Sequence, residues 1–154
     1  MMRSIYCGEL NAAQVGQDVQ LAGWVHRRRD MGGVIFLQIR DRAGLVQVVC
    51  EPDVPAVFAV ADKLRNEFVV SLKGVVRARP DSQINKDMAT GVIEVVASEI
   101  SLLNSAEPPA ILIDGHVPVS EETRLKYRYL DLRRPDMQHK LLVGMTTNGA
   151  MPCV

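Results

Sequence analysis

The 154-residue sequence has no long apolar segment, only three cysteines and as many acidic as basic side chains. The first residues, Met1 to Tyr6, include no apolar run typical of a signal peptide, and no later run is long enough to span a membrane. Cys7, Cys50 and Cys153 are odd in number, far apart and without C-x-x-C spacing. These absences argue against a disulfide framework, a zinc site and a membrane protein, and they favour reduced thiols in a cytoplasmic protein.

Common catalytic motifs are absent as well. The sequence contains no P-loop, no G-x-S-x-G, no H-E-x-x-H and no Cys/His pair at metal-ligand spacing. The adjacent carboxylates Glu121 and Glu122 lie at an expected helix start, where they favour the positive end of the helix and do not indicate acid–base catalysis. We therefore predict no active site, no bound cofactor and no metal in this chain.

What is present is a chain of globular composition, 47% hydrophobic and 23% charged, long enough for one well-buried domain with an appended piece. Turns rich in Asp and Gly punctuate its first fifty residues. The predicted strands cover residues 17–28, 34–41 and 45–50.

The middle of these strands has two different faces. Ile35, Leu37 and Ile39 share one face, while the intervening Phe36, Gln38 and Arg40 share the other. In the preceding strand Val19, Leu21 and Val25 likewise share a face. An aliphatic face opposite an aromatic, polar and basic face predicts a sheet that buries one side and offers the other to a ligand.

The pattern then changes to helical spacing between Pro55 and Arg65, which predicts a helix. A clean alternation follows at 70–79 and predicts a fourth strand, with Arg77 and Arg79 on the face opposite its aliphatic residues. After a polar loop, a fifth strand is predicted at 92–103, with Glu94 on the face opposite Ile93 and Val95. Three strands, a helix and two strands fit a mainly β fold, the five-stranded Greek-key barrel called the OB-fold.

After the barrel, assigned to residues 1–105, the composition shifts. Residues 106–140 contain prolines expected in a linker, then a short amphipathic helix that begins at Ser120 and is interrupted at Pro135. Residues 141–154 carry no charge and no clear period, so they are expected to form a poorly ordered, divergent tail.

Because the net charge is zero, binding to a nucleic acid would depend on a local basic patch. Residues 22–42 supply one, with five Arg against two Asp. Aromatic faces stack on unpaired bases, Arg neutralises phosphate, and Gln and Glu read the edges of splayed bases. The candidate set drawn from these residue types is Trp24, His26, Arg27, Arg28, Arg29, Phe36, Gln47, Arg77, Arg79 and Glu94.

Structural roles compete with several of these assignments. Trp24 is more often a core residue and is set aside, and a lone His26 is more often structural or solvated. The run Arg27 to Arg29 by itself is typical of a solvated strand end. Phe36 is harder to explain structurally, because it lies on the face that its aliphatic neighbours avoid, and it favours the binding interpretation.

A set of motifs also resembles one family closely. These are W-V-H-R-R-R-D-x-G-G-V-I-F-L-x-I-R-D-R-x-G-x-V-Q-V-V, R-N-E-F, G-x-V-R-A-R, A-T-G-x-I-E-V and R-L-K-Y-R-Y-L-D-L-R-R-P, in this order over about residues 1–140. They resemble the N-terminal anticodon-binding region of bacterial aspartyl-tRNA synthetases, which are class II aspartate–tRNA ligases. Lysyl and asparaginyl enzymes share the barrel, but R-Y-L-D-L-R-R-P together with R-R-R-D is similar to the aspartyl group.

The resemblance implies a site for the anticodon loop of a tRNA. Phe36 would stack on the central anticodon base, and Gln47 and Arg29 would hydrogen-bond it. Arg77, Arg79 and Glu94 would contact the flanking bases, and Gln83 stands where relatives often carry Asn. With Arg27 and Arg28, these residues form the implied tRNA site.

The resemblance further implies partners and a missing part. The expected partner is tRNA(Asp) and, because the Gly32-Gly33 turn resembles the relaxed type, tRNA(Asn) as well. Full-length relatives form homodimers and continue into a catalytic domain that binds ATP, Mg²⁺ and aspartate, whereas no family pattern is visible here from Leu141 onward. We therefore expect a truncated or frame-shifted fragment that lacks the catalytic core. The alternative is a free-standing OB-fold module that binds single-stranded nucleic acid or docks a partner.

Overall fold

The computed structural model describes residues 3–113 and 118–149. The chain divides into two compact units, Met1–Glu107 and Pro108–Val154, which we call the barrel unit and the helical unit. Each is described by itself. The division falls two residues after the boundary expected from the sequence.

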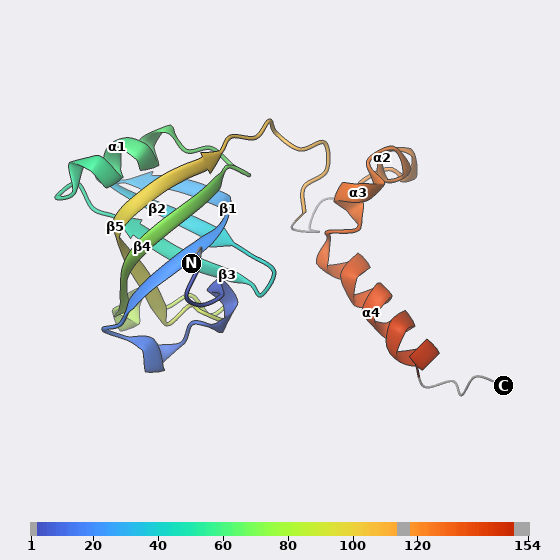
Figure 1. Cartoon of the computed structure of the whole chain (residues 1–154), viewed down its shortest axis with the longest axis horizontal. Coiled ribbons are helices and arrows are strands. Elements are labelled where there is room, and N and C mark those ends of the chain that lie inside the picture. Colours follow the sequence, from blue (N-terminus) through green and yellow to red (C-terminus); the bar gives the residue numbers. More distant parts are fainter. Residues whose placement is uncertain (1–2, 114–117, 150–154) are drawn as a thin grey trace. The chain divides into compact units, whose positions relative to one another are not determined.

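The barrel unit is built on a closed five-stranded barrel (Figure 1). Its strands follow one another around the barrel in the order β1-β2-β3-β5-β4, and β3 and β5 pair in parallel while the other neighbours are antiparallel. The strands are β1 (Asp18–Met31), β2 (Val34–Arg40), β3 (Leu45–Cys50), β4 (Val69–Ala78) and β5 (Ile93–Asn104). The mainly β OB-fold prediction is confirmed.

Alternation along the strands produces the core. In β2, Ile35, Leu37 and Ile39 are fully buried while the residues between them are only half-buried. In β4, Val70 and Leu72 are buried in the same way. Each fully buried aliphatic side chain of this size stabilises the fold by roughly 1.5–3 kcal/mol. The period of two seen in the sequence therefore determines which face of the barrel wall is available to a ligand.

β1 extends three residues beyond its predicted end and continues to Met31, which pairs with Val34 across the turn. Gly32 and Gly33 both have positive φ, of 63° and 83°, the combination that a tight two-residue hairpin requires. The turn therefore brings the arginine-rich end of β1 alongside β2.

Helix α1 (Pro55–Lys63) lies between β3 and β4, as expected, and covers one end of the barrel (Figure 1). Pro55 stands in the first turn, where its fixed φ suits a helix and its missing N–H has no helical partner to lose. Val57, Ala61 and the C-cap residue Leu64 are buried in the core. The helix ends two residues before the predicted Arg65.

Short 3₁₀ helices flank the strands: η1 (Cys7–Glu9), η2 (Ala12–Gln14) and η3 (Asp81–Gln83). Asp41 fastens the first of them to the β2–β3 turn, because its carboxylate accepts from the backbone N–H of Cys7 at 2.7 Å and of Ala43 at 2.8 Å. Burial and the neighbouring Asp41 raise the pKa of the Cys7 thiol, and burial raises that of Cys50 to about 12. Both thiols are therefore protonated core residues.

The helical unit contains α2 (Glu121–Lys126), α3 (Arg128–Asp131) and α4 (Pro135–Gly149). Ser120 caps α2 as expected, accepting from Thr123 N–H at 3.4 Å. Residues 105–113 form no helix or strand, in keeping with a connection, and the rest of the predicted proline-rich connection, 114–117, lies outside the described residues.

The helical structure that begins after Ser120 is interrupted before Pro135, as expected, because α3 ends at Asp131. Pro135 then begins α4, since the first position of a helix tolerates proline, and Asp136 favours its first turn. The expectation of a poorly ordered tail is wrong over residues 141–149, which continue α4. Residues 150–154 lie outside the described part of the chain.

Candidate nucleic-acid interface

A β-bulge in β1 decides which way its arginines face. Val25 pairs with Ile39 and Arg27 with Gln38, so His26 is the extra residue. Up to Val25 the odd-numbered residues are buried, and a regular strand would point Arg27 and Arg29 into the core. The bulge reverses this alternation, and Arg27 and Arg29 are exposed.

Phe36 lies on the outward face of β2, between two strands. Its register partners are Arg29 in β1 and Val49 in β3. Ile35 and Leu37, on either side of it in sequence, are fully buried in the core, while Phe36 is half-buried. The structure thus places Phe36 on the side away from the core, as expected from the sequence, with Arg29 as its partner on the neighbouring strand.

One register step further along, polar side chains form a row across the barrel wall. Arg27 pairs with Gln38, Gln38 with Gln47, and Arg77 with Glu94. The Nε2 of Gln47 donates to Oε2 of Glu94 at 3.2 Å, which joins β3 to β5. The row therefore carries hydrogen-bond donors and acceptors from all five strands.

Glu94 is the centre of this row. Its Oε1 accepts from Arg77 Nε at 3.0 Å and from Arg77 Nη2 at 2.8 Å, and the residue is only 3% exposed. The hydrogen bond to Glu94 raises the pKa of Arg77. Since the amide of Gln47 also points its Nε2 at Glu94, Oε1 of Gln47 is the amide atom left to accept from a base.

Arg79 does not lie where the alternation predicted. It was expected on the exposed face of β4, but it is 7% exposed, because β4 ends at Ala78 and the chain turns at Pro80. Its Nε donates to Ile93 O at 2.9 Å and lies 3.9 Å from Glu94 Oε2. Nη2 is buried without a hydrogen-bond partner, and burial lowers the pKa of this guanidinium. Leaving Nη2 of Arg79 buried without an acceptor lowers the stability of the fold, because the lost hydrogen bonds to water are not replaced.

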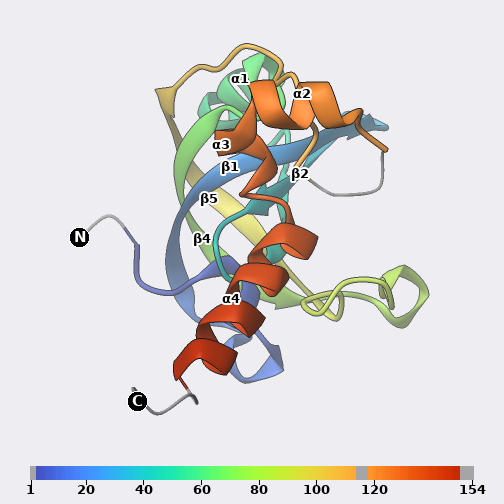
Figure 2. The same ribbon diagram turned by 90° about the vertical axis from the view of Figure 1, so that its right-hand side faces the viewer.

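The loop between β4 and β5 stands out from the barrel (Figure 2). Gln83 is exposed in η3, and its carbonyl oxygen lies 3.5 Å from Arg79 Nη1. Thr90 ties the other side of the loop to β3 by donating its hydroxyl to Leu45 O at 2.6 Å. The exposed side chain of Gln83 is therefore carried on a loop anchored at both ends.

Arg28 has a structural partner that the sequence did not indicate. Its Nε donates to Ala61 O at 3.1 Å and its Nη2 to Asp62 Oδ1 at 2.6 Å, at the C-terminal end of α1. A cation here opposes the partial negative charge of the helix end. Contact of Arg28 with RNA stays a prediction, but its Nε and Nη2 already have hydrogen-bond partners within the protein.

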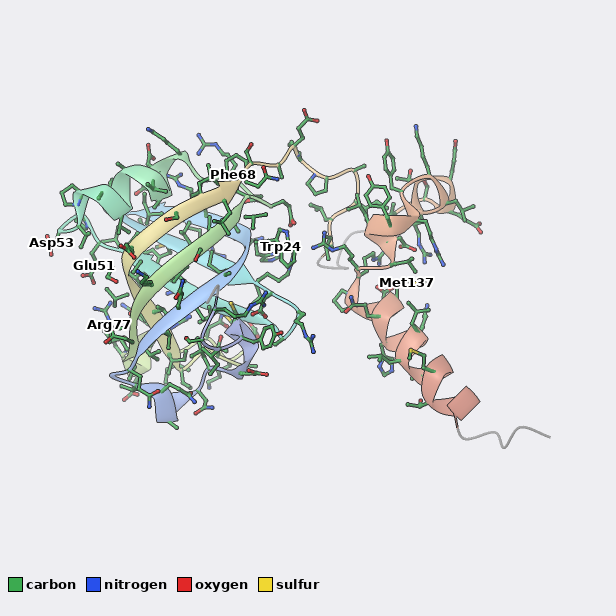
Figure 3. The ribbon with its side chains drawn as sticks, viewed as in Figure 1. Trp24, Glu51, Asp53, Phe68, Arg77 and Met137 are labelled. Carbon is green, nitrogen blue, oxygen red and sulfur yellow. The ribbon has the colours of Figure 1, made fainter. Side chains whose placement is uncertain are left out.

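Trp24 and His26, set aside on sequence grounds, belong to a different cluster. Arg40 pairs with Glu67 at 2.8 Å and lies 3.1 Å from Nδ1 of His26, and Trp24 is its partner across the strands. In Figure 3, Trp24 and Arg77 lie on different sides of the barrel. The contact with Arg40 supports the structural interpretation of His26. Glu67, the other partner of Arg40, has a positive φ of 66°.

One residue of the network was missed. Glu51 follows β3, and its Oε1 accepts from Arg77 Nη1 at 3.1 Å. The period of two along β3, from Gln47 through Val49 to Glu51, is the signal that could have placed it on the same face.

The assembled face offers stacking, cationic and amide groups, which suit recognition of single-stranded bases. Over residues 3–113 and 118–149 no group of three or more His, Cys, Asp and Glu could hold a metal ion. In the same residues no helix is long and apolar enough to cross a membrane.

Comparisons with known proteins agree with this geometry. Residues 19–103 match the tRNA anticodon family, described as an OB-fold nucleic acid binding domain. The crystal structure of asparaginyl-tRNA synthetase from Pyrococcus horikoshii complexed with asparaginyl-adenylate is similar to 88% of this chain, at 32% identity and a TM-score of 0.70. The chain covers 30% of that protein.

Two further structures resemble smaller or more divergent parts. An aspartyl-tRNA synthetase from Entamoeba histolytica matches 84% of this chain and 32% of its own at a TM-score of 0.72, and its 21% identity supports the fold alone. An OBody bound to hen egg-white lysozyme matches 68% of this chain and 95% of its own, at 32% identity and a TM-score of 0.60. The chain therefore spans about a third of the length of the synthetases that it matches.

Proposed function

Since this chain belongs to the tRNA anticodon-binding OB-fold family, with a domain like those of asparaginyl- and aspartyl-tRNA synthetases, we propose that it binds the anticodon loop of tRNA(Asp). In this proposal it is the N-terminal module of an aspartate–tRNA ligase of the cytoplasm. The ligase reaction with ATP and Mg²⁺, and the homodimer, belong to the whole enzyme. tRNA(Asn) is the second candidate partner.

The observation that carries the proposal is the unpartnered Nη2 of Arg79 beside the Glu94–Gln47 pair. In a native protein each buried donor without an acceptor calls for an explanation, and an acceptor supplied by a ligand is one such explanation. Base carbonyl and ring-nitrogen atoms are such acceptors, and Glu94 next to it accepts from exocyclic amino groups. This combination of a donor and an acceptor reads base identity, whereas a general binder needs only cations and rings.

Phe36 and the exposed arginines supply the remaining parts of the proposal. The ring of Phe36 stacks on the central anticodon base, with Arg29 beside it to bond the same base. Arg27 neutralises the backbone, and Gln47 adds its free amide acceptor. Arg77 and Gln83 complete the contacts to the flanking bases. These roles follow from the resemblance and are supported by the outward face that these side chains share.

The test is a titration of the full chain with three stem-loops: one with the tRNA(Asp) anticodon GUC, one with the tRNA(Asn) anticodon GUU, and one with a scrambled loop. The GUC loop should bind at least about tenfold more tightly than the scrambled loop, because the lost stacking and base contacts cost roughly 1–3 kcal/mol per base. The GUU loop measures the choice between the two tRNA partners.

Phe36→Ala sharpens this test. It should weaken binding of the GUC loop by about 1–3 kcal/mol, the range for one base stack. The free energy of unfolding, from urea titration, should fall by much less than the roughly 3–5 kcal/mol of a truncated core Phe. Phe36→Tyr is the matched control and should bind as the wild type does, because the ring face is kept. A variant that unfolds while its folded fraction binds normally would make Phe36 a core residue.

The second candidate is a module that takes any single strand or a protein partner. It draws on the OBody relative, whose structure is a complex with hen egg-white lysozyme. Equal binding of all three stem-loops would favour it over anticodon recognition.

A further inference from the structure

Glu51 has no role in the sequence resemblance, yet it is part of the network described above. Its Oε1 accepts from Nη1 of Arg77 at 3.1 Å, while Nε and Nη2 of the same guanidinium donate to Glu94. Two carboxylates therefore share one arginine, and every nitrogen of Arg77 has a contact. Figure 3 shows Glu51 and Arg77 on the same side of the barrel.

The two carboxylates differ in how firmly they hold Arg77. The side chain of Glu94 is 4% exposed, whereas those of Glu51 and Arg77 are 34% and 48% exposed. Exposed ion pairs contribute little to stability and exchange readily with other ions. A ligand can thus replace Glu51 on Nη1 while Glu94 keeps the guanidinium in position.

The anion that an RNA strand brings to this surface is its phosphate. Phosphate and carboxylate oxygens bind a guanidinium with the same hydrogen-bond geometry. We propose that Glu51 occupies, in the free protein, the position of an RNA phosphate oxygen on Arg77 Nη1, and so acts as an internal competitor of the RNA. This inference rests on the proposed function, because it requires an RNA strand that passes over β3 and β4.

A competitor of this kind has two consequences. With both carboxylates in place, the charges of Glu51 and Glu94 balance those of Arg77 and Arg79, so the cluster offers a phosphate no net positive charge until Glu51 moves away. When the RNA leaves, Glu51 returns to Nη1 and lowers the barrier to release. Glu51 therefore lowers affinity for RNA without reading any base, in contrast to Glu94.

The experiment measures dissociation constants and dissociation rates of the full chain for the GUC stem-loop and the scrambled stem-loop. Glu51→Gln should bind both about two- to fivefold more tightly, the range for one exposed charge pair, and should release both more slowly. The ratio between the two loops should stay unchanged, because a phosphate contact carries no base identity. The gain should shrink between about 50 and 200 mM salt.

Asp53→Asn is the matched control. It removes the same charge two residues further along the chain, from an exposed side chain that is not among the ion-pair partners of Arg77. It should produce a smaller gain than Glu51→Gln. An equal gain in both variants would reduce the effect to net charge and overturn the competitor role. Glu51→Ala, which removes the carboxylate altogether, should reproduce the result of Glu51→Gln and provides a second variant if the first does not fold.

The outcomes separate this inference from the proposed function. Unchanged or weaker binding by Glu51→Gln, with a wild type that prefers the GUC loop, overturns the competitor and leaves anticodon recognition standing. Tighter binding of both loops by Glu51→Gln, with a wild type that binds them equally, overturns anticodon recognition and supports the competitor on a general single-strand binder. A wild type and a variant that bind neither loop overturn both.

Discussion

Each unit of the chain buries a carboxylate among arginines, and the two do so differently. Both oxygens of Asp131, which is fully buried, accept from arginines of its own segment: Arg124 Nε at 2.9 Å and Arg128 Nη1 at 2.8 Å, with Arg134 Nη1 at 3.6 Å. Glu94 takes its partners from distant parts of the sequence, Gln47 on β3 and Arg77 on β4.

The difference lies in how each cluster is assembled. Arginines within ten residues of one another can surround Asp131 as soon as α2 and α3 form, and the hydrogen bond from Arg124 lowers the pKa of that carboxyl. The surroundings of Glu94 exist only once the barrel has closed, and they include the unpartnered Nη2 of Arg79. The Asp131 cluster also leaves a buried guanidinium nitrogen, Nε of Arg134, without a hydrogen bond. What distinguishes the two clusters is therefore their assembly: one forms within a single segment, and the other needs the closed barrel.

The largest effect is expected from Glu94→Ala. It leaves the guanidinium of Arg79, with a side chain only 3% exposed, without its nearby carboxylate. Removing one partner of a buried ion pair costs about 3–5 kcal/mol, and the free energy of unfolding of the barrel should fall toward that range. Urea titration followed by fluorescence of Trp24, the single tryptophan of the sequence and a residue of β1, measures it. An unchanged midpoint would mean that Arg79 does not depend on Glu94.

Asp131→Asn should act on the other unit alone. Three arginines lose the charge they surround, so α2 and α3 should lose helix, seen as a smaller circular-dichroism signal at 222 nm. The urea midpoint from Trp24 fluorescence should not move, because Trp24 lies in the barrel unit. Lys140→Gln, which removes a charge from an exposed residue of the same unit outside the Asp131 cluster, is the control. A shift of the Trp24 midpoint would show that the two units unfold together.

Acid should also destabilise the helical unit of the wild-type protein through Asp131. The pKa of Asp131 is held below its ordinary 3.8, first by the hydrogen bond from Arg124, so its contribution is complete above that value and is lost as the pH falls through the lower, folded value. Wild-type helix signal at 222 nm should therefore include a step below pH 3.8 that Asp131→Asn lacks. The same step in both proteins would assign it to other carboxylates.

The smallest effect is expected from Arg28→Ala. The change removes the hydrogen bond to Ala61 O and the pair with Asp62, which together stabilise the end of α1 by about 1 kcal/mol, since Arg28 is half-buried. Arg27→Ala, at the exposed neighbour, should leave the Trp24 midpoint unchanged and weaken all stem-loops alike. If the two variants exchange these effects, Arg28 contacts phosphate and Arg27 supports the fold.

Alternation predicted the barrel because its strands bury one face, and it predicted the outward position of Phe36 for the same reason. It did not give the burial of Arg79, where the strand ends and the chain turns, or the contacts of Arg28 with α1, more than thirty residues away in sequence. Such contacts depend on where elements stop and meet, and a local pattern does not contain that information. Glu51 is different, because it lies one residue past β3 and continues the period of two of that strand.

The extra residue in β1 has a consequence for how this surface can change by mutation. Deleting His26 would restore the regular period and exchange the faces of every residue between the bulge and the hairpin, so Arg27 and Arg29 would turn inward together. A single-codon deletion would thus remove two cations from the outward side of the barrel without altering either arginine. Substitutions can adjust this surface one side chain at a time, whereas its orientation depends on the length of the chain between Val25 and Arg27.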